Sequence, residues 1–283
     1  MSAVVLSVYR WRVVLFIGAI IALIAGPFIG GFLPLGTPQT VVKAIIFIGL
    51  GLMLLALLLT ACGRRLSPSK SAIVLDSPVG GRWVAVNSPQ SRVPSHGLHV
   101  YGQTYAIDFI FDPESPVRPD FGGEAMRPVT DYPGFGVPVY GMADGTVVKA
   151  IANQRDHRAR SSFAGFLYMF MEGMIRELGG PTRIVGNHVI IDHGGGNFSL
   201  LAHLQQGSVT VKPGERVTSG QEIGKCGNSG NSSEPHVHAQ VMDRISLLTA
   251  QGQPFVVRDC EVNGARGDQL PGNEESMTVT YCP

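Results

Sequence analysis

Two long runs without a charged side chain near the start of the chain constrain its fold more than any other feature. They cover residues 13–33 and 44–61. The first is long enough to span the hydrocarbon core of a bilayer, and the second is just long enough. With the short link at 34–43, they predict a membrane hairpin of two transmembrane helices over residues 1–66. The alternative is a buried helical hairpin of a soluble domain, although such helices rarely lack every charge.

The second apolar run ends in Leu59-Thr60-Ala61-Cys62, which matches the pattern of a bacterial lipoprotein cleavage site. Processing there would make Cys62 a lipidated N-terminus. Because such signals normally begin near the start of a chain, a chance cysteine at a small-residue helix end is the alternative.

Short alternating runs separated by Gly and Pro turns follow a linker at 67–81. They predict an all-β domain over 82–258, an antiparallel β sandwich or barrel-like sheet, with a C-terminal extension at 259–283. One expected strand, 103–111, carries Asp108 among apolar neighbours. A carboxylate in that setting needs a partner, because an unpaired buried charge is costly. The alternative is an Asp that caps a neighbouring turn.

Residues 161–178 have helical spacing and predict one helical insertion between the strands. The apolar stripe of this helix either belongs to the core or packs on the membrane or on the hairpin. Its members are Phe163, Phe166, Leu167, Phe170 and Met174.

Three of the four cysteines lie in the predicted β region and its extension. Cys260 and Cys282 flank the C-terminal segment and can form a disulfide in an oxidising compartment, or remain two unpaired thiols. We expect Cys226 to be a buried core thiol.

A Gly/Asn/Ser-rich turn at 227–233 leads into Glu234-Pro235-His236-Val237-His238. Side chains alternate with period two in an extended strand, so His236 and His238 point the same way. Neutral imidazole is both a common zinc ligand and a general base near neutral pH, so this pair can provide one of each. The alternative is a polar strand edge with two hydrogen-bonded histidines.

Seven short motifs occur in order between residues 82 and 255, and together they resemble the lysostaphin/LytM-type zinc metallopeptidases, which cut peptide cross-links of bacterial cell walls. The resemblance implies a β fold of the duplicated-hybrid-motif type. The motifs are Gly136-Val137-Pro138-Val139, Asp144-Gly145-Thr146-Val147-Val148, Gly186-Asn187-His188-Val189-Ile190-Ile191-Asp192-His193-Gly194, Ala202-His203-Leu204, Val211-Lys212-Pro213-Gly214-Glu215-Arg216-Val217, Gly220-Gln221-Glu222-Ile223-Gly224 and Pro235-His236-Val237-His238.

The same resemblance implies a Zn²⁺ ion held by a His, an Asp and the second His of the His-x-His pair. Carried over by position, Asp108 and His238 are metal ligands, while His203 and His236 are the catalytic histidines. Three protein ligands leave a coordination position for water, as in catalytic zinc sites.

The chain departs from the family pattern at the first ligand, which normally lies four residues before the Asp. Thr104 stands there. We expect His96 from the preceding loop to replace it, with His99 as the reserve candidate. Gly97 and Gly102 give this loop the backbone freedom to fold back over the strand. The alternative is that both histidines are exposed loop residues and that water fills the vacancy.

Three functions remain open at this point. The first is a membrane-anchored zinc metalloendopeptidase acting on peptidoglycan peptides. The second is a degenerate, non-catalytic module that binds cell wall or regulates another hydrolase. The third is a carrier or sugar-transport-like β domain, which gives no reason for a His-x-His beside Asp108. The formal net charge of +1 gives no indication of a nucleic-acid partner.

The expected substrate and the distribution of basic residues disagree about location. A wall peptidase must face the outside of the cytoplasmic membrane. The link between the apolar runs carries only Lys43, whereas basic residues flank both ends, so the positive-inside rule places both ends in the cytoplasm. We follow the substrate argument, and cleavage at Cys62 would remove the conflict. The flanking residues are Arg10, Arg12, Arg64, Arg65 and Lys70.

Overall fold

The computed structural model describes residues 3–32, 39–66 and 71–280. The chain divides into two compact units. One comprises Met1–Ser69 with Leu248–Ala250, and the other comprises Lys70–Leu247 with Gln251–Pro283.

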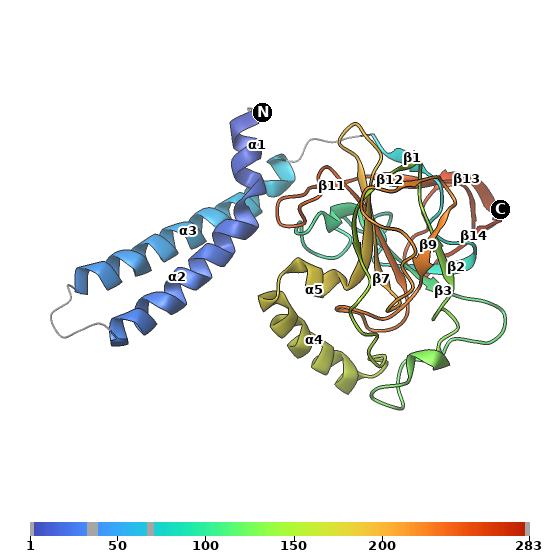
Figure 1. The fold of residues 1–283 in the computed structure, drawn as a ribbon, viewed down its shortest axis with the longest axis horizontal. Helices are drawn as coiled ribbons and strands as arrows, with labels where there is room; N and C mark the ends of the chain where they lie inside the picture. The colour runs from blue at the N-terminus through green and yellow to red at the C-terminus, as the bar shows by residue number, and fades with distance from the viewer. Residues whose placement is uncertain (1–2, 33–38, 67–70, 281–283) are drawn as a thin grey trace. The chain divides into compact units, whose positions relative to one another are not determined.

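The first unit is helical. It consists of α1 (Ala3–Arg10), α2 (Arg12–Phe32) and α3 (Gln39–Leu66), and the last two lie side by side (Figure 1). Small residues allow this approach, since a Cβ added at Gly26 would lie 3.3 Å from the side chain of Ile45.

One described helix is long and apolar enough to cross a membrane, over Gln39–Cys62. The apolar part of α2, Arg12–Phe28, is shorter. The predicted pair of transmembrane helices is therefore not confirmed, although one candidate span is present.

The second unit is built on a twelve-stranded mixed sheet in the order β1-β12-β14-β2-β3-β10-β7-β6-β5-β8, with β11 on β10 and β13 on β12. β1 lies parallel to β12, whereas β10 lies antiparallel to both of its central neighbours. A separate ribbon pairs β4 with β9. The sequence is thus right about a mostly β domain, but closure into a barrel is not confirmed. The strands are β1 (Ile73–Leu75), β2 (Gly81–Val86), β3 (Ile107–Phe111), β4 (Pro138–Tyr140), β5 (Gly145–Ile151), β6 (Asn187–Asp192), β7 (Phe198–Leu204), β8 (Arg216–Val217), β9 (Glu222–Lys225), β10 (Val237–Met242), β11 (Gly252–Gln253), β12 (Phe255–Val262), β13 (Ala265–Gln269) and β14 (Ser276–Val279).

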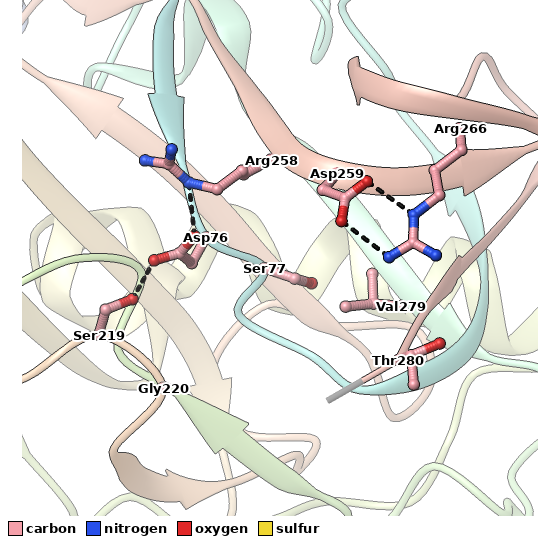
Figure 2. A pocket seen from close by; sticks show the side chains of 9 residues that line it. All are labelled: Asp76, Ser77, Ser219, Gly220, Arg258, Asp259, Arg266, Val279 and Thr280. Carbon is pink, nitrogen blue, oxygen red and sulfur yellow. Dashed lines mark hydrogen bonds and ion pairs between the residues drawn. The ribbon is translucent and has the colours of Figure 1, made fainter. Parts of the chain in front are cut away.

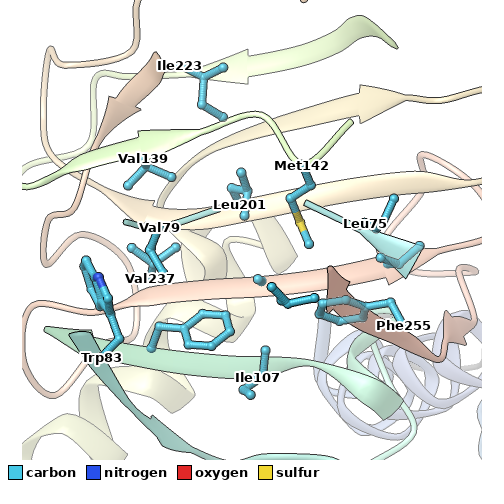
Figure 3. Packing of buried hydrophobic residues seen from close by; sticks show 14 of the residues in the cluster. Leu75, Val79, Trp83, Ile107, Val139, Met142, Leu201, Ile223, Val237 and Phe255 are labelled. Atoms are coloured by element: carbon cyan, nitrogen blue, oxygen red, sulfur yellow. The ribbon is translucent and has the colours of Figure 1, made fainter. Parts of the chain in front are cut away.

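A cluster of fully buried apolar side chains holds the central strands in place (Figure 3). Trp83 of β2, Ile107 of β3 and Leu201 of β7 all belong to it and have no exposed surface. Every residue of β10 is buried, so this strand is fixed from both faces. A strand held in this way can position polar side chains at its end with little freedom.

The strand expected at 103–111 is shorter than predicted. Residues Gln103–Tyr105 form a 3₁₀ turn, η1, and β3 begins at Ile107. Gly102 precedes the turn with φ of 76°, a left-handed conformation that glycine adopts without steric cost. Thr104 therefore lies outside the strand that carries Asp108. A second 3₁₀ turn, η2, covers Val129–Asp131.

The helical insertion is α4 (Phe163–Leu178), followed by the short α5 (Pro181–Val185). Ser162 caps α4, because its Oγ accepts a hydrogen bond from the Gly165 main-chain N–H at 3.1 Å. The expectation that the apolar stripe of this helix belongs to the core is wrong: Phe163 is 79% exposed and Phe170 61%. The reason is that the face turned to the domain carries Gly165 and charged residues instead.

The cysteines differ in their surroundings. Cys226 is fully buried in the apolar cluster, as expected, and burial raises the pKa of its thiol. Cys260 is a buried free thiol whose Sγ lies 3.5 Å from the main-chain oxygen of Gln269. Its predicted partner Cys282 lies outside the described residues.

Candidate functional site

Strand register brings Asp108 and His238 together. β10 lies between β3 and β7, and His238 stands opposite Asp108 on one side and Ala202 on the other. Residues directly opposite in an antiparallel pair share a face, so the two side chains meet. His236, just before β10, reaches the same carboxylate, with its Nε2 3.8 Å from Asp108 Oδ1.

His203 joins this group through an irregular backbone. Regular alternation would turn it away from the face that Ala202 shares with His238. However, His203 has φ of 61°, in the left-handed region. Its ring centroid lies 4.7 Å from that of His236 and 5.8 Å from that of His238. The local departure from strand geometry therefore assembles the three histidines.

The loop before η1 folds back and delivers His96. The Ser95 main-chain N–H donates to the oxygen of Thr104 at 3.0 Å, and Ser95 Oγ donates to the oxygen of Gln103 at 3.2 Å. Gly97 and Gly102 both have positive φ, as the predicted fold-back requires. The loop thereby lies over the position that Thr104 occupies.

His96, Asp108 and His238 form a compact set of potential ligands. One nitrogen or oxygen of each lies within 4.8 Å of the others. His96 Nε2 is 3.0 Å from Asp108 Oδ2, and His238 Nδ1 is 2.7 Å from Asp108 Oδ1. Two imidazoles and a carboxylate are the donor types that Zn²⁺ binds.

Hydrogen bonds on the far sides of both imidazoles orient their electron pairs. Because Ser95 Oγ donates to a main-chain oxygen, it can accept from Nδ1–H of His96 at 3.0 Å, which leaves Nε2 with its lone pair facing Asp108. In the same way, His238 Nε2–H donates to Gln240 Oε1 at 3.0 Å. The Gln240 amide is itself fixed, since its Nε2 donates to the oxygen of Tyr101 at 2.9 Å.

In the neutral tautomers that these outer hydrogen bonds favour, two nitrogen lone pairs face one carboxylate at hydrogen-bond distance. Such an arrangement is repulsive unless protons or a cation lie between the groups. The donor set and its outer hydrogen bonds therefore fit a divalent metal ion.

The charge of Asp108 is stabilised despite its burial. Burial alone would raise the pKa of this carboxyl, but the neighbouring imidazoles of His96 and His238 hold the pKa well below its usual range. Asn87 adds a further hydrogen bond from Nδ2 to Oδ2 at 2.7 Å. The partner predicted from the sequence for this carboxylate is thus a set of polar groups.

His203 and His236 are set up to accept protons. Each donates Nδ1–H to a main-chain oxygen at 2.8 Å, His203 to Ser229 and His236 to Glu234. Nε2 of each ring is then the basic nitrogen. Burial lowers the pKa of both imidazoles, and for His203 the neighbouring His236 and His238 lower it further. Both therefore remain neutral near pH 7, as a general base requires.

The reserve candidate His99 lies apart from this cluster. Its Nδ1 is 3.2 Å from Thr104 Oγ1. Two other contributors were not anticipated from the sequence, Asn87 and Gln240. Gln240 follows His238 by two positions on the same strand, so period-two alternation could have indicated it. No local pattern marks Asn87.

A second group of polar residues lines a pocket of about 380 Å³ elsewhere in this unit (Figure 2). Arg258 Nε contacts Asp76 Oδ1 at 2.9 Å, and Arg266 binds Asp259 through two bonds of 2.6 and 2.7 Å. Ser219 donates to Asp76. Each carboxylate here is matched by an arginine, so the pocket lacks the electron-pair arrangement of the histidine site.

Comparison with known proteins identifies the same region. Residues 167–254 match peptidase family M23, and this stretch contains His203, His236 and His238 but not His96 or Asp108. The chain is 39% identical over 59 residues to the peptidoglycan DD-endopeptidase ShyA of Vibrio cholerae, and 30% identical over 136 residues to ShyC, a peptidoglycan DD-endopeptidase of the same organism.

These matches cover only parts of the proteins concerned. The ShyA match covers 21% of this chain and 13% of ShyA, and the ShyC match covers 44% of this chain and 24% of ShyC. Among solved structures, the catalytic domain of lysostaphin from Staphylococcus simulans has a TM-score of 0.32 and 22% identity, covering 57% of this chain and 83% of that domain. The sequence matches confirm the resemblance inferred from the ordered motifs: this chain carries a peptidase family M23 domain.

Proposed function

We propose that this protein is a membrane-anchored zinc metalloendopeptidase that hydrolyses peptide bonds of peptidoglycan cross-links. The observation that carries the proposal is that ligand atoms of His96, Asp108 and His238 lie within 4.8 Å of one another, beside His203 and His236. The named peptidoglycan endopeptidases among the relatives support the substrate class.

His96, Asp108 and His238 would hold the zinc ion. Bound there, zinc supplies a Lewis acid that polarises the scissile carbonyl and lowers the pKa of water to about 7. Ser95 and Gln240 act on the outer sides of the two imidazoles and keep their ligating nitrogens turned inward. Residues in such positions typically contribute about 10–100-fold to metal affinity or activity.

His203 and His236 would carry the proton transfers. One would accept a proton from the attacking water at Nε2 and pass it to the leaving amine, and the other would accept the remaining proton of that water as the product carboxylate forms. Their main-chain partners, Ser229 and Glu234, fix both rings without competing for Nε2. The burial that keeps both rings neutral also excludes bulk water from the proton-transfer path.

We place the β unit, with the peptidase domain at 82–258, outside the cytoplasmic membrane and attach it through the apolar helix that covers Gln39–Cys62. Digestion by added protease in intact spheroplasts tests this location. Cleavage of the unit supports it, and full protection would place the unit in the cytoplasm.

Matched histidine variants of the full chain test the proposed zinc site. We expect His96→Ala to weaken zinc binding by more than about a hundredfold, beyond the usual cost of losing an outer residue, and to abolish digestion of purified cell wall. His99→Ala, which changes a histidine of the same loop, should keep both zinc binding and digestion. If zinc affinity falls only in His99→Ala, the ligand assignment moves to that residue. If the wild-type chain binds zinc stoichiometrically but digests no wall, a non-catalytic wall-binding module replaces the peptidase proposal.

A further inference from the structure

The helix α4 turns its apolar side away from the domain on which it sits. Its exposed residues form a continuous face along the whole helix, with exposures between 50% and 89%. The members are Phe163, Phe166, Leu167, Tyr168, Phe170, Met171, Met174, Ile175 and Leu178. One charged residue of the helix, Glu177, is exposed as well.

Two of the charged residues of α4, Glu172 and Arg176, are paired on the inner side. The Glu172 carboxylate contacts Arg160 and Arg176, each at 2.8 Å, and the Arg160 side chain is only 4% exposed. Burial would raise the pKa of Glu172, but the two guanidinium groups lower it below its usual value. Glu177 accepts a hydrogen bond from the Tyr101 hydroxyl. Glu177 is exposed, so this one carboxylate lies at the C-terminal end of the outer face.

This orientation is fixed by contacts at both ends and in the middle of the helix. At the start, Arg160 donates its main-chain N–H to the oxygen of Ser233 at 2.5 Å. In the middle, a Cβ added at Gly173 would lie 3.0 Å from Asn231 Oδ1. The helix cannot rotate its apolar face inward without breaking the ion pair between Glu172 and Arg160, which lies outside the helix. A contiguous exposed apolar face of this kind indicates a binding surface rather than a folding requirement.

We propose that the apolar face of α4 docks on the surface of a lipid bilayer, with the helix lying in the interface between headgroups and acyl chains. This rests on the membrane anchoring proposed above. Six residues separate the end of α3 at Leu66 from the start of β1 at Ile73, which limits the reach of that connection to roughly 25 Å. An anchored domain on so short a tether always has a bilayer within reach.

The composition of the face favours lipid over a protein partner of complementary charge. Phe, Leu, Met and Ile side chains suit the acyl boundary, and Tyr168 at one side suits the headgroup level. Because the polar side of α4 is already bound to the domain, docking would bury the apolar side while leaving every inner ion pair intact.

Lipid-borne quenching of a fluorophore on α4 tests the proposal in the full chain. Cys62 and Cys282 are first replaced by Ser, and the buried Cys226 and Cys260 are kept. Phe170→Cys and Met174→Cys are labelled with an environment-sensitive dye. The chain is reconstituted in vesicles of phosphatidylethanolamine and phosphatidylglycerol that contain nitroxide-labelled lipid. The control is Ala265→Cys, at the exposed β12–β13 turn, which Figure 1 shows at the opposite end of this unit from α4.

We expect nitroxide lipid to quench the dye at positions 170 and 174 several-fold more strongly than at 265. In the Phe170→Cys chain, adding Met174→Glu should remove this excess, because a carboxylate is costly in the interface, whereas Met174→Leu should keep it.

The remaining outcomes overturn the proposal in distinguishable ways. If the chain floats with the vesicles but quenching is equal at all three positions, docking by α4 is excluded while the anchor stands. If the chain does not float with the vesicles, the anchor itself fails, and docking fails with it. If the dye on α4 is shielded only at high protein density and is not quenched by lipid, the face binds a second copy of this chain instead.

Discussion

The histidine site and the pocket of Figure 2 contain similar numbers of ionisable groups in opposite environments. Asp108 has a side chain 7% exposed, and ring nitrogens of His238 and His96 lie 2.7 and 3.0 Å from its two oxygens. In the pocket, Asp259 and Arg266 are 60% and 63% exposed and neutralise one another directly. Both regions lie on strands of the same sheet, so secondary structure does not distinguish them.

The two regions differ in the free energy that a charged group would lose if its partner were removed. In water, an exposed ion pair exchanges its partner for solvent at little cost. A buried carboxylate facing two nitrogen lone pairs has no such exchange and requires a cation or protons. Only the buried arrangement gathers two imidazoles and a carboxylate away from water, and that donor set makes it a candidate metal site.

The largest expected effect comes from removing the charge of the buried carboxylate. Asp108→Asn keeps the side-chain shape but leaves a neutral ligand, so we expect zinc affinity to fall more than about a hundredfold and wall digestion to become undetectable. Metal analysis after dialysis and a turbidity assay measure both. Asp259→Asn is the matched exposed control and should change neither. Retention of stoichiometric zinc by Asp108→Asn would remove this residue from the ligand set.

Next in size are the two histidines that accept protons. His203→Ala and His236→Ala should each lower hydrolysis by about 10²–10⁴-fold, the usual contribution of positioned acid–base groups. Zinc should stay bound, because neither residue belongs to the proposed ligand set. Rates and metal content are measured on the same preparations. A variant that loses zinc would transfer its histidine to the ligands.

A buried histidine outside the site allows the effect of burial on a titratable group to be measured as a change in the free energy of unfolding. Burial lowers the pKa of His188 to about 4. Between pH 6.5 and 4 the unfolded chain therefore binds a proton that the folded chain does not, so the free energy of unfolding falls on acidification, by up to about 3 kcal/mol.

Urea unfolding from pH 7 to pH 4.5 measures this effect. His188→Leu should flatten the decline in the free energy of unfolding, since the titrating ring is gone. Val189→Ala, at the next buried position of β6, should lower stability by a similar amount at every pH. An unchanged acid slope in His188→Leu would show that other groups carry the decline.

The smallest effect is expected in the exposed pocket. Arg266→Gln removes both hydrogen bonds to Asp259, yet the urea midpoint should not shift measurably, because solvent replaces the lost partner. A clear drop in the urea midpoint would show that this ion pair stabilises the fold despite its exposure.

The sequence determined those features that depend on local pattern. Period-two alternation indicated that Asp108 lies in a mostly apolar strand and that His236 and His238 point the same way, and both side chains lie near the same carboxylate. Ordered motifs led to the peptidase family, and a run without charge indicated a candidate membrane span. Each of these is encoded within a few residues, so no knowledge of the rest of the chain is needed.

Tertiary structure decided what depends on residues far apart. The carboxylate of Asp108 is surrounded by Asn87, 21 positions away, and by His238, 130 positions away. The apolar spacing of α4 revealed its amphipathic character, but only contacts such as the ion pair of Glu172 with Arg160 turned that side outward. Burial and hydrogen bonding are properties of the assembled sheet and loops, and local alternation does not contain them.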